Sequence, residues 1–115
     1  LEWYRAYSNL DSIMKDTEEL FEFIAIQLNG KPEIEFQGKT ISLKTPWPRL
    51  TIRALFDSIG VDLVKLNTPE KLAKRAVKLG LQTSPQDSWD DLYFRIWLNL
   101  IEPKLPADQA VFVSR

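Results

Sequence analysis

The most regular stretch of this chain is LDSIMKDTEELFEFIAIQLNGKP, residues 10–32. Asn9 or Asp11 can cap its start, because both side chains accept hydrogen bonds from free backbone N–H groups. Asn29-Gly30 followed by Pro32 is a stop signal. The stretch predicts a long helix over residues 11–28, with a stripe at helical spacing made of Leu10, Ile13, Met14, Thr17, Leu20, Phe21, Ile24 and Leu28.

Shorter elements follow this helix. Residues 33–36 and 40–43 alternate polar and apolar side chains around Gln37-Gly38-Lys39, which predicts a small hairpin. Residues 45–49 are held extended by two prolines. Thr51 has the character of a helix cap, and Gly60 ends the short helix that it begins.

Two more helices are predicted in the second half of the chain. Thr68 caps the first, with Pro69 at its first position and Gly80 at its end. Ser88 caps the second, Trp89 to Ile101, which is apolar on nearly every side. A helix of that kind is buried on several faces, so we expect either self-association into a homo-oligomer or cover from further chain.

Length and composition exclude several classes of protein. The 115 residues correspond to one domain at most. Cysteine and histidine are absent, which excludes disulfides, cysteine–zinc sites and the Ser-His-Asp triad. The net charge of -1 gives no general basic footprint. No apolar run approaches the ~18 residues that span a bilayer, and no metal-ligand spacing is present, so we expect neither a membrane nor a metal partner.

One polar pair stands out near the start of the chain. Residues 1–8 are rich in aromatics and predict a strand. Glu2 and Tyr4 would then project to one side, and Trp3 and Arg5 to the other. A carboxylate and a phenolic hydroxyl that point together can form a site for a cation or an ammonium group. The alternative is an ordinary exposed sheet face.

A second group consists of four cations on the predicted helix after Thr68. They are Lys71, Lys74, Arg75 and Lys78, opposite the apolar stripe of that helix. These side chains either form a solvated helix face or contact RNA or a partner protein.

Several segments resemble a known family. Leu1-Glu2-Trp3-Tyr4-Arg5 resembles the strand that ends the second signature of class II aminoacyl-tRNA synthetases, in the lysyl branch. Residues 45–56 resemble the Trp/Phe-Pro-x-Leu-Thr segment of that branch. Residues 88–98 and 101–105 resemble W-D-D-L-x-F-R and x-E-P-x-L of one subfamily, the short paralogues (GenX or PoxA type) that lysylate elongation factor P. Ala110 stands where that subfamily has the proline of P-x-F-V.

The resemblance implies that residues 1–115 are a single, helix-rich fragment of a class II catalytic domain, which has an α+β fold with an antiparallel sheet flanked by helices. The parent enzyme would be cytoplasmic. It would activate a lysine-type amino acid with ATP and magnesium, and transfer it to a lysine of elongation factor P. By the same resemblance, Glu2 and Tyr4 line the amino-acid pocket. The family's phosphate-binding arginines and metal ligands match no residue here, so we assign no catalytic residue and expect the fragment alone to be inactive.

Two alternatives remain open. One is a fragment of an ordinary lysyl-tRNA synthetase, with tRNA as the acceptor. The other is a non-catalytic helical module that binds protein or RNA through the four cations of residues 71–78. The residues do not distinguish α-lysine from β-lysine as the amino acid.

Overall fold

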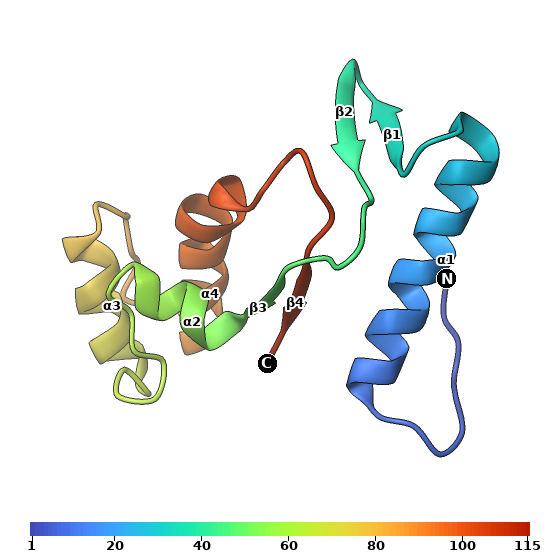
Figure 1. Ribbon diagram of the computed structural model, residues 1–115. Helices are drawn as coiled ribbons and strands as arrows, with labels where there is room; N and C mark the ends of the chain where they lie inside the picture. Colours follow the sequence, from blue (N-terminus) through green and yellow to red (C-terminus); the bar gives the residue numbers. More distant parts are fainter. The chain divides into compact units, whose positions relative to one another are not determined.

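The computed structural model describes residues 1–115 and contains helices together with short strands, which confirms the predicted α+β class (Figure 1). The elements are α1 (Leu10–Asn29), β1 (Glu33–Phe36), β2 (Lys39–Ser42), β3 (Arg49–Thr51), α2 (Ile52–Ser58), α3 (Pro69–Lys78), α4 (Trp89–Ile96) and β4 (Phe112–Ser114). The chain divides into two compact units. Unit 1 is Leu1–Arg49 with Pro106–Val113, and unit 2 is Leu50–Leu105 with Ser114–Arg115.

The long helix α1 is confirmed, with both of its predicted ends. At the start, the Asn9 side chain accepts the backbone N–H of Ser12 at 3.0 Å. At the end, Gly30 has a φ of 74°, a left-handed conformation that glycine adopts without a Cβ clash. Its N–H donates to the Ile26 carbonyl at 2.8 Å. Local bonds therefore account for both boundaries.

The predicted hairpin is also confirmed. Strands β1 and β2 pair antiparallel, with Ile34 opposite Ile41. Gln37 and Gly38 both have positive φ at the turn. The Ser42 end of β2 continues the pairing by bonding to Asp108 and Ala110 through its N–H and C=O. A second two-stranded sheet pairs β3 with β4.

Unit 1 has a small core centred on Trp47. This side chain is buried together with Ala25 and Leu43. The ring of Phe112 lies 5.1 Å from the Trp47 ring, and that of Phe21 lies 5.7 Å away in an edge-on arrangement. The indole N–H donates to the Leu43 carbonyl at 2.9 Å. Helix, hairpin and extended segment therefore converge on one aromatic residue.

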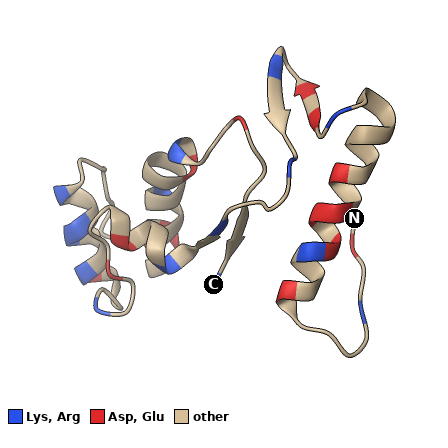
Figure 2. Ribbon diagram, viewed as in Figure 1, with Lys and Arg blue, Asp and Glu red and all other residues tan.

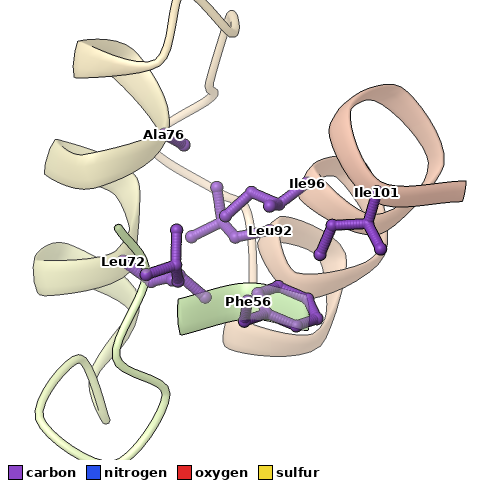
Figure 3. Close-up of a cluster of buried hydrophobic side chains, with 7 residues drawn as sticks. Phe56, Leu72, Ala76, Leu92, Ile96 and Ile101 are labelled. Atoms are coloured by element: carbon purple, nitrogen blue, oxygen red, sulfur yellow. The ribbon is translucent and has the colours of Figure 1, made fainter. Parts of the chain in front are cut away.

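Unit 2 has the larger core, which joins α2, α3 and α4 (Figure 3). Phe56 is its largest buried side chain, with its ring stacked 5.0 Å from Tyr93 and 6.3 Å from Trp97. The caps predicted at Thr51, Thr68 and Ser88 are all present. The fully or nearly fully buried members of the core are Phe56, Val61, Leu72, Ala76, Leu92, Ile96 and Ile101.

The strand predicted over residues 1–8 is wrong, because the structure has no strand there. Residues 1–5 have no regular structure, and Ala6 and Tyr7 form a turn before α1. A strand requires ladder hydrogen bonds from a neighbouring strand. The strands of this chain pair only as β1 with β2 and β3 with β4, so residues 1–8 have no such neighbour.

The last helix differs from its prediction in two ways. The α-helix ends at Ile96, and Trp97–Ile101 continue as a π-helix before a 3₁₀ turn at Glu102–Lys104. The Asn99 side chain donates to the Arg95 carbonyl at 2.7 Å, and this carbonyl is the acceptor that the Asn99 N–H would use in an α-helix. Where the Asn99 side chain occupies this acceptor, the backbone changes to the wider hydrogen-bond spacing of a π-helix.

The exposure of this last helix agrees with the expectation that residues 1–115 alone do not cover all of its apolar faces. Leu92 and Ile96 are buried, whereas Phe94 and Leu98 are each 57% exposed. The apolar residues therefore divide into a core face and a solvent face. Self-association into a homo-oligomer, or cover from further chain, stays a prediction.

Candidate functional site

The predicted pair Glu2 and Tyr4 lies in the irregular segment that precedes α1. The Tyr4 hydroxyl donates to Glu2 Oε1 at 3.2 Å, so the two side chains do lie together. Both are exposed, Tyr4 to 90%. The geometry brings the two groups to one place without the strand that was predicted to align them. Their assignment to an amino-acid pocket remains a prediction.

The neighbouring Arg5 attaches this segment to α1. Its guanidinium bonds both carboxylate oxygens of Asp16, at 2.9 and 3.0 Å. The Ser8 hydroxyl donates to the Arg5 carbonyl at 2.9 Å, which closes the turn before the helix. Arg5 is thus paired with an acidic side chain of α1.

The chemistry open to the pair follows from its hydrogen-bond direction. Because the Tyr4 hydroxyl donates to Glu2, its own lone pairs stay free to accept. A carboxylate and a phenolic oxygen therefore both offer acceptors to a ligand. An alkylammonium group has three donors and no acceptor, so it matches such a pair in charge and in hydrogen bonding.

A second polar cluster, which sequence reasoning missed, lies inside unit 1. Glu18 of α1 is only 4% exposed. Its Oε1 accepts the Trp47 backbone N–H at 2.9 Å and the Arg49 guanidinium at 2.6 Å. Arg49 also donates to the Trp47 carbonyl at 2.8 Å and lies 5.3 Å above the Phe112 ring. The cluster ties the extended segment before β3 to the middle of α1.

The charges of this cluster stabilise each other. The hydrogen bond from Arg49 lowers the pKa of the Glu18 carboxyl, while burial opposes the shift and the Trp47 N–H adds to it. The same bond raises the pKa of Arg49. Glu18 is therefore an ionised side chain at neutral pH despite its burial.

One signal in the sequence points to Glu18. It lies four residues after Met14 and seven before Ala25, and these two are the buried apolar residues of α1. A carboxylate at a core position of a helix needs a partner, because an unpaired buried charge is strongly disfavoured. The identity of the partner, some thirty residues away, was not readable from the pattern.

The four cations of residues 71–78 lie on α3 in unit 2, and Figure 2 shows the run of blue bands along that helix. Together with Leu66 they line a shallow hollow of about 170 Å³. Arg75 is half-buried and its guanidinium donates to the Gly60 carbonyl. The three lysines are exposed and take part in none of the five ion pairs of the structure.

The structure contains no group of three or more Asp, Glu, His or Cys side chains that could hold a metal ion. The side chains of residues 1–115 therefore do not form a magnesium site by themselves, and we assign no metal-dependent step to them. None of the helices is both long and apolar enough to cross a membrane.

Comparison with known proteins relates the chain to ligases. No protein-family model matches it. A lysine–tRNA ligase of Pelotomaculum thermopropionicum is 34% identical over 108 residues, which cover 91% of this chain and 21% of the relative. That of Thermoanaerobacter pseudethanolicus is 34% identical over 106 residues, again 91% and 21%. That of a Roseiflexus species is 30% identical over 120 residues, 99% of this chain and 24% of the relative.

The chain thus spans about a fifth to a quarter of the length of these relatives. It is similar to a segment of a ligase, and more particularly to a segment of lysine–tRNA ligases. The names of the relatives fit an ordinary lysyl-tRNA synthetase better than an elongation factor P ligase.

Proposed function

We propose that this chain is a segment of an ATP-dependent class II ligase that activates a lysine-type amino acid and transfers it to tRNA. The observation that carries the proposal is the similarity to lysine–tRNA ligases along 91% of the chain. Activation joins the amino-acid carboxylate to the α-phosphate of ATP and releases pyrophosphate. Transfer to a hydroxyl of tRNA then releases AMP.

The paired acceptors of Glu2 and Tyr4 support a lysine-type substrate in particular. An alkylammonium group carries a positive charge and three N–H donors. The Glu2 carboxylate can pair with that charge, and the Tyr4 hydroxyl can accept one of the N–H groups. The 3.2 Å bond between the two oxygens keeps them within reach of one ligand nitrogen.

A lysine side chain of elongation factor P is the second candidate acceptor. The resemblance of residues 88–98 and 101–105 to W-D-D-L-x-F-R and x-E-P-x-L favours it. Incubating the intact protein that carries this segment with ATP, labelled lysine and either acceptor separates the two. Label on tRNA supports the main proposal, and label only on elongation factor P replaces it with the second.

The proposal is tested first by lysine-dependent exchange between ATP and pyrophosphate. We expect exchange with the intact protein and background exchange with residues 1–115 alone, which span about a fifth of the relatives. Lack of lysine-dependent exchange in the folded intact protein would contradict the proposal. Exchange by the 115-residue chain at the rate of the intact protein would contradict the assignment as a segment.

The Glu2→Gln variant tests the substrate pair. It keeps the shape of the side chain but removes the charge, so the transition-state binding energy derived from kcat/KM for lysine activation by the intact protein should weaken by about 1.5–3 kcal/mol, the usual range for a charged hydrogen bond. Tyr4→Phe should have a smaller effect, about 0.5–1.5 kcal/mol. Glu35→Gln, at an exposed position of β1, makes the same change of charge and should leave activation unaltered. Equal activity of Glu2→Gln and Glu35→Gln would remove Glu2 from the site.

A further inference from the structure

We propose that the cationic face of α3, made of Lys71, Lys74, Arg75 and Lys78, binds the phosphate backbone of an RNA duplex. The placement of positive charge in the chain is the first observation. Unit 1 has six Lys and Arg against nine Asp and Glu, whereas unit 2 has nine against seven. The overall charge of -1 therefore hides a basic unit, and four of its nine cations lie within eight residues.

The second observation is that these cations are available. The chain's ion pairs engage Arg5, Lys31, Arg49, Arg53 and Arg95, and none engages the four cations of α3. Leu72 and Ala76 of the same helix are buried, so the core holds α3 with its opposite side toward solvent. A cation that is paired with a carboxylate must give up that partner before it binds a phosphate. The four cations of α3 have no carboxylate partner.

Arg75 is the fixed member of the face. One guanidinium N–H donates to the Gly60 carbonyl, which anchors the side chain against unit 2. Gly60 has a φ of 78° there, and an added Cβ would lie 3.6 Å from Arg75 Nη1. A guanidinium has five N–H donors, so several remain for a ligand. An arginine held in this way loses little freedom on binding.

The spacing suits a row of phosphates. Lys71, Lys74 and Lys78 follow one side of α3 over two turns, a rise of about 10 Å at 1.5 Å per residue. A nucleic-acid duplex carries a regular row of phosphates along each strand. A row of cations of this length can contact more than one phosphate of a strand, and Arg75 lies beside the middle of the row.

The lining of the hollow favours a backbone over bases and over a protein. It contains no aromatic side chain, so bases of a single strand have nothing to stack on. Its one apolar residue is the half-buried Leu66, whereas protein interfaces centre on aromatic and apolar anchors. The recognition is therefore electrostatic and independent of sequence. The choice of RNA over DNA rests on the proposed function, in which tRNA is the acceptor.

The test measures binding of the 115-residue chain to a labelled RNA duplex by fluorescence anisotropy, between about 50 and 200 mM salt. The triple variant Lys71→Gln, Lys74→Gln, Lys78→Gln removes three charges from exposed positions. It should weaken binding about tenfold or more at the low-salt end, and the slope of log K against log salt should become shallower by roughly 2–3. The single variant Lys78→Gln should reduce the slope by about 1.

The matched control is Lys39→Gln, Lys44→Gln, Lys104→Gln, which removes the same charge from exposed positions outside the face. It should leave affinity within about twofold. Equal weakening by the two triple variants would show a general charge effect and overturn the proposal. Tighter binding of a DNA duplex than of the RNA duplex would also overturn it. Lysine-dependent exchange needs no RNA, so its outcome is independent of this test.

Discussion

Replacing Phe56 with alanine should lower the free energy of unfolding of unit 2 by about 3–5 kcal/mol, the range for removing a large aromatic side chain from a core. Phe56 of α2 is fully buried and lies in one core cluster with residues of α3 and α4. Its ring stacks on Tyr93 and Trp97, so the cavity would open between α2 and the last helix. Whole domains are stable by only about 5–15 kcal/mol, so the variant should be partly unfolded at moderate urea.

Urea unfolding followed by far-UV circular dichroism measures this effect, with amide hydrogen exchange in α3 and α4 as the local readout. Phe94→Ala is the matched control, because it removes the same side chain at a position that is 57% exposed. It should change stability by roughly 0.5 kcal/mol or less, as surface substitutions usually do. Equal losses for Phe56→Ala and Phe94→Ala would mean that the core is not placed as described.

The second large effect is expected at Glu18. Glu18→Gln keeps an oxygen that can accept the Trp47 N–H, but it removes the charge that Arg49 meets at 2.6 Å. The loss should be about 1.5–3 kcal/mol, as for other hydrogen bonds to charged groups. Hydrogen exchange of the Trp47 amide should accelerate by a corresponding factor. Glu19→Gln, the next residue along α1 and exposed, should be close to neutral.

The pH dependence gives an independent test of the same cluster. The pKa of Glu18 is lowered in the folded chain, chiefly by the hydrogen bond from Arg49. Below about pH 4.3, the ordinary pKa of a glutamate, the unfolded chain therefore binds the proton more readily than the folded one. The stability from Glu18 is fully present above that pH, and it is lost as the pH falls through the lowered pKa of the folded state.

The difference in stability between the unmodified chain and Glu18→Gln should consequently be constant near neutral pH and shrink in acid. Other carboxylates, such as Asp87 beside Arg95, also have a lowered pKa and contribute to acid unfolding. Taking the difference between the two proteins cancels those contributions. A difference that grows as the pH falls would contradict the ion pair.

The starts of the helices and the end of α1 follow from the sequence by itself, because each depends on partners within a few residues, whereas the end of α4 at Ile96 was not predicted. Asn9 reaches the Ser12 N–H, and Ser88 and Asp91 bond each other's backbone across the same short distance. Glycine at residue 30 supplies a left-handed end to α1 wherever the helix lies. The hairpin also follows from the sequence, since its turn and its alternation of polar and apolar side chains involve only neighbouring residues.

The pairing of Glu2 with Tyr4 was also anticipated from the sequence, although for a different geometric reason. Strand periodicity was expected to align the two, and an irregular segment brings them together instead, through a side-chain hydrogen bond at 3.2 Å. Residues two apart are close in any extended backbone, so their proximity survives the loss of the strand.

The tertiary structure alone decided which residues find distant partners. Residues 1–8 have strand composition, but a strand exists only where a second one supplies its hydrogen bonds. Glu18 and Glu19 are adjacent glutamates of α1. Only contacts with Trp47 and Arg49, which are distant in the sequence, make Glu18 buried and ionised, whereas Glu19 is exposed. The exposure of Phe94 and Leu98 was likewise settled by which side of the helix the core covers. Local chemistry sets where elements begin and end, and contacts between residues far apart in the chain set what each side chain does.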